Sequence, residues 1–257
     1  MTMTMPMQQV PTTTKQLNLV QNQPSGCGNT SQECHSCDPR GGCLAEKMME
    51  FQGHIDQLRQ RNLTYKSNEH IFREGEDSTG LYVIKSGSVK LYLTTEDGEE
   101  QVLGFYMRGD VVGLDGQINV PRNSSAIALE TTSICKLPLN HLSDRGRGRG
   151  YPKLIAELMT RDHNLVLMLA RKDADGRLAS FLCDLSRRFE KSGYSATAFN
   201  LSMSRQDIGS YLGLAIETVS RTLTRFQESG LLQASRRKLE ILDFDRLKKV
   251  AGSQATP

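Results

Sequence analysis

The feature that most constrains the fold is a regular alternation of short apolar runs and glycine turns between residues 63 and 137. Glycines recur there every 11 or 12 residues, at Gly75, Gly87, Gly98 and Gly109. Runs rich in β-branched and aromatic residues lie between or just after them, at 81–84, 89–93, 101–105 and 111–112. Asp97-Gly98 is a strong hairpin signal. Many short strands at this spacing predict a jelly roll or β-barrel, which by itself does not identify a ligand.

Composition places the chain among ordinary soluble proteins. Its 257 residues, 37% apolar and 24% charged, are enough for one large or two medium domains with real cores. No run approaches the ~18 apolar residues that span a bilayer, and no secretory signal is visible, so we expect a cytoplasmic protein without a membrane partner. The net charge of +3 is too small to indicate nucleic acid, although Arg and Lys concentrate after residue 145.

Four of the six cysteines fall between residues 27 and 43, in a stretch without apolar periodicity. The spacing Cys34-x2-Cys37-x5-Cys43 places three thiols on a short loop that one soft-metal centre could draw together. Cysteine clusters in the cytosol more often bind metal than form disulfides. Such a loop would become ordered only with its ligand, because metal-binding free energy becomes folding free energy. We expect a disordered arm over residues 1–24 before it, and a helix over residues 44–58 after it.

A long helix is predicted from residue 152 to residue 172, and its apolar residues follow a heptad. The a and d positions are Ile155, Leu158, Leu165 and Leu169, with Asp162 on the intervening a position. Asp162 could simply reach solvent at the edge of a core-facing helix. In a parallel two-fold dimer it would instead face its own copy, and the repulsion would weaken the dimer and make it easy to switch. We favour the dimer, because the rest of the chain calls for one.

A helix-turn-helix is predicted between residues 201 and 232. Ser204 with Asp207 three residues later forms a capping-box-like start for a short helix at 205–212. Gly213 then allows a tight turn before a second helix over 215–228, which is the helix-turn-helix layout. An amphipathic helix that starts at Gly176 precedes this unit, and a basic hairpin signal at 236–238 follows it.

The second helix carries a polar face at positions that reach base edges in the major groove. Glu217, Ser220 and Arg221 share this face. Arg can bond guanine with two hydrogen bonds, Glu can accept from cytosine, and Ser can serve either partner. Most such charge clusters are ordinary solvated helix faces, but the cap, the turn and the basic hairpin together favour DNA. Arg205, Arg225 and the hairpin residues are then expected to hold phosphates.

At this point the chain resembles a known family, the Crp/Fnr transcription regulators of bacteria. The resemblance covers about residues 27–242 and rests on the order of β-roll, long helix and winged helix-turn-helix, with Ile216-Glu-Thr-Val-Ser-Arg221 in the second helix. It implies an α+β fold with a cyclic-nucleotide-binding-like jelly roll. The expected segments are a disordered arm (1–24), a cysteine loop with a helix (25–60), the β-roll (61–150), a dimerisation helix (151–173) and the winged helix-turn-helix domain (174–257).

Within the family the chain is most similar to the anaerobic branch, the fumarate and nitrate reduction regulators. That resemblance implies an oxygen-labile [4Fe-4S] cluster on Cys34, Cys37, Cys43 and Cys135, with Cys27 as a surplus thiol. It implies a homodimer that binds promoter DNA of the type TTGAT-N4-ATCAA while the cluster is intact, and that returns to monomers in oxygen. Genes of anaerobic metabolism would be activated or repressed.

The resemblance also implies a contact with RNA polymerase through an acidic turn. The residues expected at this contact are Thr95, Glu96, Asp97, Gly98 and Glu99.

Three other functions are weighed against this one. Cyclic AMP is not expected as a ligand, because the stretches 113–115 and 123–125 offer no arginine for a buried phosphate. Zinc on Cys34, Cys37, Cys43 and His35 would give a regulator without a redox role, although His35 lies between two cysteines and is poorly placed. An enzyme is not expected, since no nucleophile–base pairing, phosphate loop or metal-hydrolase motif is present.

Overall fold

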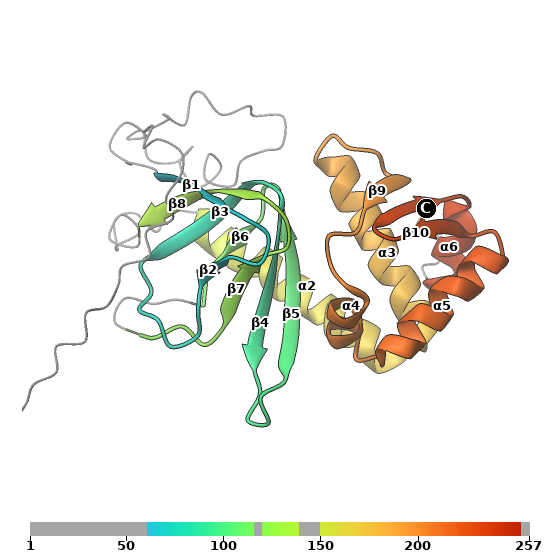
Figure 1. The fold of residues 1–257 in the computed structure, drawn as a ribbon, viewed down its shortest axis with the longest axis horizontal. Coiled ribbons are helices and arrows are strands. Elements are labelled where there is room, and N and C mark those ends of the chain that lie inside the picture. Colours follow the sequence, from blue (N-terminus) through green and yellow to red (C-terminus); the bar gives the residue numbers. More distant parts are fainter. Residues whose placement is uncertain (1–60, 116–119, 139–149, 253–257) are drawn as a thin grey trace, which may run out of the picture.

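The computed structural model of this chain describes residues 61–115, 120–138 and 150–252 (Figure 1). The predictions for the arm at 1–24, for the cysteine loop and for the helix at 44–58 therefore lie outside the described residues. Eight strands make the N-terminal part of the described chain: β1 (Arg61–Tyr65), β2 (His70–Phe72), β3 (Gly80–Ser86), β4 (Ser88–Thr94), β5 (Glu100–Met107), β6 (Val111–Val112), β7 (Ser125–Ala128) and β8 (Thr132–Pro138).

These strands form two four-stranded antiparallel sheets, in the orders β1-β8-β3-β6 and β2-β7-β4-β5. Alternating apolar residues from both sheets meet between them, including the buried side chains of Phe72, Ile84, Val89 and Ile134. The predicted roll is confirmed. All four glycines of the 11- or 12-residue repeat have positive φ, between +81° and +88°, so each lies in a tight turn as its spacing indicated.

Two helices follow the roll. The long helix α2 (Gly150–Arg171) matches the predicted span within two residues at its start, and α3 (Ala174–Lys191) begins after Asp173, whose side chain accepts a hydrogen bond from the Gly176 N–H. Figure 1 shows α2 running behind the roll and reaching the helices on its right. Within the part of the chain that the structure describes, no helix is long and apolar enough to cross a membrane.

The winged helix-turn-helix is confirmed as well. Helix α4 (Arg205–Leu212) and helix α5 (Ile216–Glu228) lie next to a three-stranded sheet of β9 (Ala198–Asn200), β10 (Leu232–Ser235) and β11 (Lys238–Ile241), and α6 (Phe244–Val250) follows. The turn between β10 and β11 holds Arg236 and Arg237, so the basic hairpin is the wing.

One apolar cluster joins the roll to the helix-turn-helix part. It contains Val102, Phe105 and Met107 from β5, which pack with buried residues of α3, α4 and α5. The ring of Phe105 lies 5.8 Å from that of Phe181 in α3 and 5.3 Å from that of Tyr211 in α4. The orientation of the helix-turn-helix is therefore set by packing against one edge of the roll (Figure 1).

Candidate nucleic-acid interface

The local sequence explains why the two helices of the helix-turn-helix keep a fixed angle. Ser204 and Asp207 form the complete capping box at the start of α4, and Gly213 ends the helix in a left-handed conformation. Gly209 is a third determinant that the sequence analysis missed. A Cβ there would lie 2.6 Å from the carbonyl oxygen of Leu214, so only glycine lets the turn pass this close. A glycine inside the short helix predicted at 205–212 was the available signal in the sequence.

Helix α5 divides into the two faces that its spacing predicted. Val219, Leu223 and Phe226 are buried in the core, whereas Glu217, Ser220 and Arg221 are exposed. Arg221 uses its Nε to donate to the Glu217 carbonyl at 3.3 Å, which leaves the terminal guanidinium nitrogens for a ligand. Ala215 caps the helix without a side-chain hydrogen bond, so the first N–H groups are open to an acceptor such as a phosphate oxygen.

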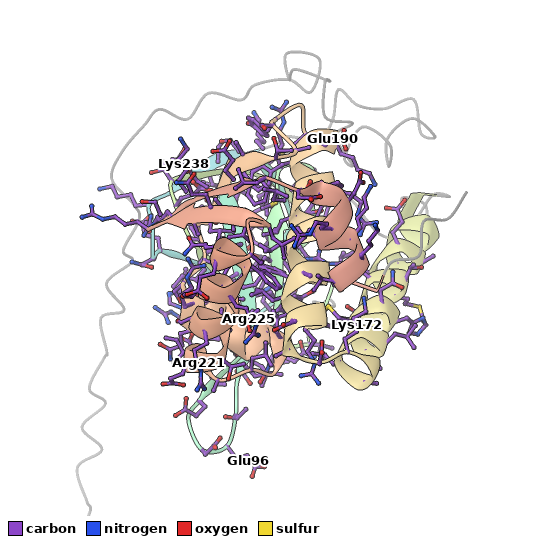
Figure 2. The ribbon with its side chains drawn as sticks, turned by 90° about the vertical axis from the view of Figure 1, so that its right-hand side faces the viewer. Glu96, Lys172, Glu190, Arg221, Arg225 and Lys238 are labelled. Atoms are coloured by element: carbon purple, nitrogen blue, oxygen red, sulfur yellow. The ribbon has the colours of Figure 1, made fainter. Side chains whose placement is uncertain are left out.

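The residues expected to hold phosphates differ in how available they are. The wing residues Arg236, Arg237 and Lys238 are exposed. Arg205 is half-buried, and this burial lowers its pKa below the usual arginine value. Arg225 forms an ion pair with Asp175 of α3, so a phosphate would compete with that carboxylate. Figure 2 shows Arg221, Arg225 and Lys238 on the side of the DNA-binding part that faces away from the roll.

The residues of the heptad predicted in α2 differ in their exposure to solvent. Ile155, Leu158, Leu165 and Leu169 are half-buried in the single chain, and Asp162 is exposed. Between them the guanidinium of Arg161 stacks on Tyr106, 4.6 Å from the ring centre, and donates to the Phe105 carbonyl.

Three exposed apolar residues of α2 were not assigned from the sequence. Met159, Val166 and Leu167 are 53%, 62% and 51% exposed, and the first two flank Asp162 at spacings of three and four residues. Met159, Asp162 and Val166 share an exposed face, and with the half-buried Ile155 and Leu169 they form a second heptad register. The sequence signal for this register was the spacing of 4, 3, 4 and 3 residues between its members. Leu158 and Leu165, which are half-buried against the body of the chain, suggested the other register instead.

The acidic turn lies at the tip of the β4–β5 hairpin, which projects from the roll (Figure 1). The Thr95 N–H donates to the Glu99 carbonyl at 2.9 Å, and the Gly98 N–H donates to the Thr95 carbonyl at 2.9 Å. The Thr95 hydroxyl donates to Asp97 and thereby lowers the pKa of that carboxyl. Glu96 and its acidic neighbours are exposed, and Figure 2 shows Glu96 pointing away from the body.

Cys135 is the one predicted cluster ligand within the described residues. It is 5% exposed in β8, opposite Asn62 and Val83, and it alternates with Ile134, which faces the roll interior. Arg61 pairs with Lys136, so the chain enters the roll beside Cys135. Cys43 precedes Arg61 by 18 residues, which can span up to ~60 Å when extended. Chain length therefore allows the cysteine loop to reach Cys135.

Cys34, Cys37 and Cys43, and the reserve Cys27, lie outside the described residues. Over residues 61–115, 120–138 and 150–252, no group of three or more His, Cys, Asp or Glu side chains could hold a metal ion. A thiol at the entry point of the cysteine segment fits one corner of a four-thiolate cluster.

The stretches 113–115 and 123–125 contain no arginine, but a buried arginine lies next to the second of them. Arg122 is 2% exposed and directly precedes the stretch 123–125. Its guanidinium lies 4.0 Å from the centre of the Phe72 ring and donates to the Gly80 carbonyl at 2.8 Å and to the Gly113 carbonyl at 3.4 Å. Asp115 lies 3.5 Å away. Both terminal nitrogens of the guanidinium therefore already have oxygen acceptors within the roll.

Comparison with known proteins agrees with this two-part architecture. Residues 62–145 match the cyclic nucleotide-binding domain, and residues 176–250 match the Crp-like helix-turn-helix domain. The solved structure of FixK2 from Bradyrhizobium japonicum superposes with a TM-score of 0.68 at 29% identity, over 76% of this chain and 99% of that one.

Characterised relatives align over most of the chain. The transcriptional activator protein anr of Pseudomonas aeruginosa is 38% identical over 86% of this chain and 93% of its own length. The fumarate and nitrate reduction regulatory protein of Escherichia coli is 36% identical over 88% of this chain and 92% of its own length. With both domains matched in order and the recognition helix exposed, the chain belongs to the Crp/Fnr family of transcription regulators.

Proposed function

We propose that this protein is a cytoplasmic, oxygen-responsive regulator that binds promoter DNA as a homodimer and controls genes of anaerobic metabolism. The observation that carries the proposal is the exposed polar face of α5, on a helix-turn-helix whose cap and turn are fully formed. The names of the relatives, a transcriptional activator and a fumarate and nitrate reduction regulator, support the anaerobic role.

Base reading is assigned to three side chains of the recognition helix. Arg221 has its terminal nitrogens available for the two acceptors of a guanine, while Glu217 can accept from a cytosine amino group. Ser220 can donate or accept between them. The exposed wing and Arg205 would hold phosphates, which position the helix without reading sequence. A palindrome of the type TTGAT-N4-ATCAA would then present one half-site to each subunit, about one helical turn apart.

Dimerisation is assigned to the outer face of α2. Met159 and Val166 are apolar and exposed, and in a parallel dimer each would lie against the partner helix. Asp162 lies between them and would meet its own copy, where like charges repel. The apolar residues would therefore allow the dimer to form, and the repulsion between the two Asp162 carboxylates would keep its affinity low. A dimer of this kind can be switched by a few kcal/mol.

The cofactor proposed here is a [4Fe-4S] cluster on Cys34, Cys37, Cys43 and Cys135. When bound, it would supply an oxygen-labile link between the N-terminal segment and the roll. Cys135 offers a thiol held within a β-ladder, opposite Val83, where backbone hydrogen bonds fix its position. Metal affinity at such thiols contributes directly to the folding of the segment that carries the other ligands.

The acidic tip of the β4–β5 hairpin is proposed as the contact with RNA polymerase. Thr95, Glu96, Asp97, Gly98 and Glu99 form a rigid turn whose backbone hydrogen bonds are internal. No ion pair between described residues involves Glu96, Asp97 or Glu99, so these carboxylates are presented to a basic partner.

The cofactor is tested by purification in the absence of oxygen. We expect a brown protein whose visible absorbance disappears in air, with iron and sulfide in equal amounts. Cys34→Ala and Cys135→Ala should each remove the colour, whereas Cys183→Ala, at a buried thiol of the α3 core, should keep it. A colourless protein that holds zinc would support the second candidate, a zinc-stabilised regulator without a redox role.

DNA recognition is tested with fluorescently labelled palindromic and random duplexes in the same anaerobic buffer. Arg221→Ala should lose about 1–3 kcal/mol of binding to the palindrome, because a bidentate base contact is removed. Arg237→Ala in the wing is the control and should weaken both duplexes alike. Equal losses on both duplexes for Arg221→Ala would make it a phosphate contact only.

A further inference from the structure

A buried lysine of the roll is bonded to the first helix of the helix-turn-helix. Lys90 of β4 has a side chain that is only 10% exposed, and its Nζ lies 2.9 Å from Asp207 of α4 and 2.6 Å from Glu100 of β5. A buried ammonium needs such partners, because taking its charge out of water is costly. Burial acts to lower the pKa of Lys90, but the hydrogen bonds to both carboxylates outweigh it and raise the pKa, so the lysine stays charged.

The carboxylate of Asp207 has two separate tasks. One oxygen accepts from Lys90, and the other accepts from the Ser204 N–H at 2.9 Å in the capping box of α4. The Ser204 hydroxyl in turn accepts from the Asp207 N–H at 3.0 Å. The group that starts α4 is therefore the same group that binds the roll. Moving Lys90 relative to Asp207 would disturb the N-terminal end of the helix.

The same surface carries further hydrogen bonds along α4. Ser210 donates to the Glu100 carbonyl at 2.9 Å and accepts from the Val102 N–H at 2.9 Å. The Gln101 side-chain amide donates to the Ser210 carbonyl at 2.8 Å. These bonds use the backbone of β5, which continues from the acidic tip of the hairpin to Phe105. The start of β5 is thus hydrogen-bonded to one side of α4.

The opposite end of α4 is held by a different residue. Arg177 of α3 donates to the Leu212 carbonyl at 3.1 Å and to the Leu169 carbonyl of α2 at 2.8 Å. Lys90 and Arg177 therefore hold α4 at its two ends, one from the roll and one from α3. Since Gly209 and Gly213 lock α5 onto α4, this attachment also sets the direction of the recognition helix.

We propose that Lys90 is a positioning residue for DNA recognition, which holds α4 through Asp207 so that the two recognition helices of a dimer keep the separation of a palindrome. The inference rests on the proposed DNA-binding function. Lys90 touches no DNA in this role. Its loss would leave the chemistry of Arg221 and Glu217 intact and would let each helix-turn-helix pivot about its Arg177 end.

The test compares three labelled duplexes: the TTGAT-N4-ATCAA palindrome, the same palindrome with an N5 spacer, and a single half-site. Cluster-loaded full-length protein and its Lys90→Met variant are titrated without oxygen. We expect unchanged affinity for the half-site and about tenfold weaker binding to the N4 palindrome, because the competent orientation becomes a minor population. The preference for N4 over N5 should shrink towards one, because a loose domain tolerates both spacings.

A purely structural role for Lys90 would give a different result. The variant would then have a lower melting temperature but would keep the wild-type preference for N4 over N5, and that outcome overturns the proposal. Lys90→Arg, which retains the charge, should keep the preference, and Lys66→Met, at an exposed lysine of the roll, should change nothing. Sedimentation checks that every variant is still a dimer.

Two further outcomes are separable. If wild type does not distinguish the palindrome from random DNA, the proposed function fails, whatever Lys90 does. If Lys90→Met does not fold, Ser210→Ala replaces it in the test. This change removes hydrogen bonds between α4 and β5 with little loss of side-chain volume. Ser210→Ala should likewise reduce the preference for N4 over N5. An unreduced preference would refute the proposal that contacts between the roll and α4 orient the helix-turn-helix.

Discussion

At the scale of single residues, Arg122 shows what the roll of this chain can hold. Its guanidinium fills the interior position beside Phe72 and Tyr82, at 4.0 and 5.5 Å from their ring centres. Carbonyls of Gly80 and Gly113 and the carboxylate of Asp115 surround it. A cyclic nucleotide phosphate would have to displace these acceptors and face the Asp115 carboxylate. We therefore propose that the roll does not bind cyclic AMP, for a reason that adds to the one its sequence suggested.

Replacing this arginine should cost stability. Arg122→Met keeps the apolar contact with Phe72 but leaves the Gly80 carbonyl without its donor, so we expect a loss of about 1.5–3 kcal/mol in the free energy of unfolding. Urea unfolding followed by circular dichroism measures it. Arg73→Met, at an exposed position, is the control. An unchanged midpoint, or a rise in the melting temperature of wild type with cyclic AMP, would contradict this view of the roll.

At the scale of elements, α2 has two faces with different tasks. The face around Arg161 belongs to the body of the chain, because its guanidinium stacks on Tyr106 and bonds the Phe105 carbonyl. The face with Met159, Asp162 and Val166 is exposed in the single chain. A helix that already packs on one side can offer only its other side to a partner. The dimer seam is therefore proposed one helical step away from Leu158 and Leu165.

Removing the charge from this seam should strengthen the dimer. In air, Asp162→Ala is expected to favour dimerisation by about 1–4 kcal/mol, the range of like-charge repulsion at close contact. Sedimentation equilibrium in air measures the dissociation constant. Glu157→Ala removes an equally charged, exposed residue outside the seam and should have no effect. If Asp162→Ala has the same dissociation constant as wild type, the repulsion argument is refuted. Val166→Glu, which adds a charge to the seam, should abolish the dimer.

At the scale of the whole molecule, the roll, α2 and the winged helix-turn-helix meet at one junction. Phe105 is its centre: its ring packs on Phe181 and Tyr211, and its carbonyl accepts from both Arg161 and Arg188. Arg188 is also ion-paired with Asp110 of the roll. The roll and α2 therefore contact the DNA-binding part directly at this junction.

The contact between Lys90 of the roll and Asp207 of α4 should weaken in acid. Burial would raise the pKa of Asp207, but hydrogen bonds from Lys90 and Ser204 outweigh it and lower the pKa below that of an unfolded aspartate. A carboxyl with a lowered pKa stabilises the folded state fully above about pH 5. This stabilisation is lost as the pH falls through the pKa of Asp207 in the folded protein, which lies below ~3.9. Wild type should exceed Asp207→Asn in unfolding free energy at pH 7, and the difference should shrink towards pH 3. Asp245→Asn, whose side chain is 90% exposed, should show no such trend.

Much of the fold follows from short-range patterns. Glycine spacing predicted the turns of the roll, the capping box predicted the start of α4, and apolar periodicity predicted the buried face of α5. Each of these patterns depends on residues within about a dozen positions of each other, so local sequence carries the information. The exposed Glu217, Ser220 and Arg221 were predictable for the same reason, since helical periodicity alone separates them from the core.

Sequence by itself thus determined the elements, their order and the family, because caps, turns and periodicities are local properties of the chain. Tertiary structure alone decided which charges are used internally. Arg122 is enclosed in the roll, Arg225 is paired with Asp175 50 residues away, and Lys90 meets Asp207 117 residues away. The reason is physical: whether an ionic group faces water, DNA or a buried partner depends on which surfaces dock, and docking joins residues whose sequence separation contains no trace of the contact.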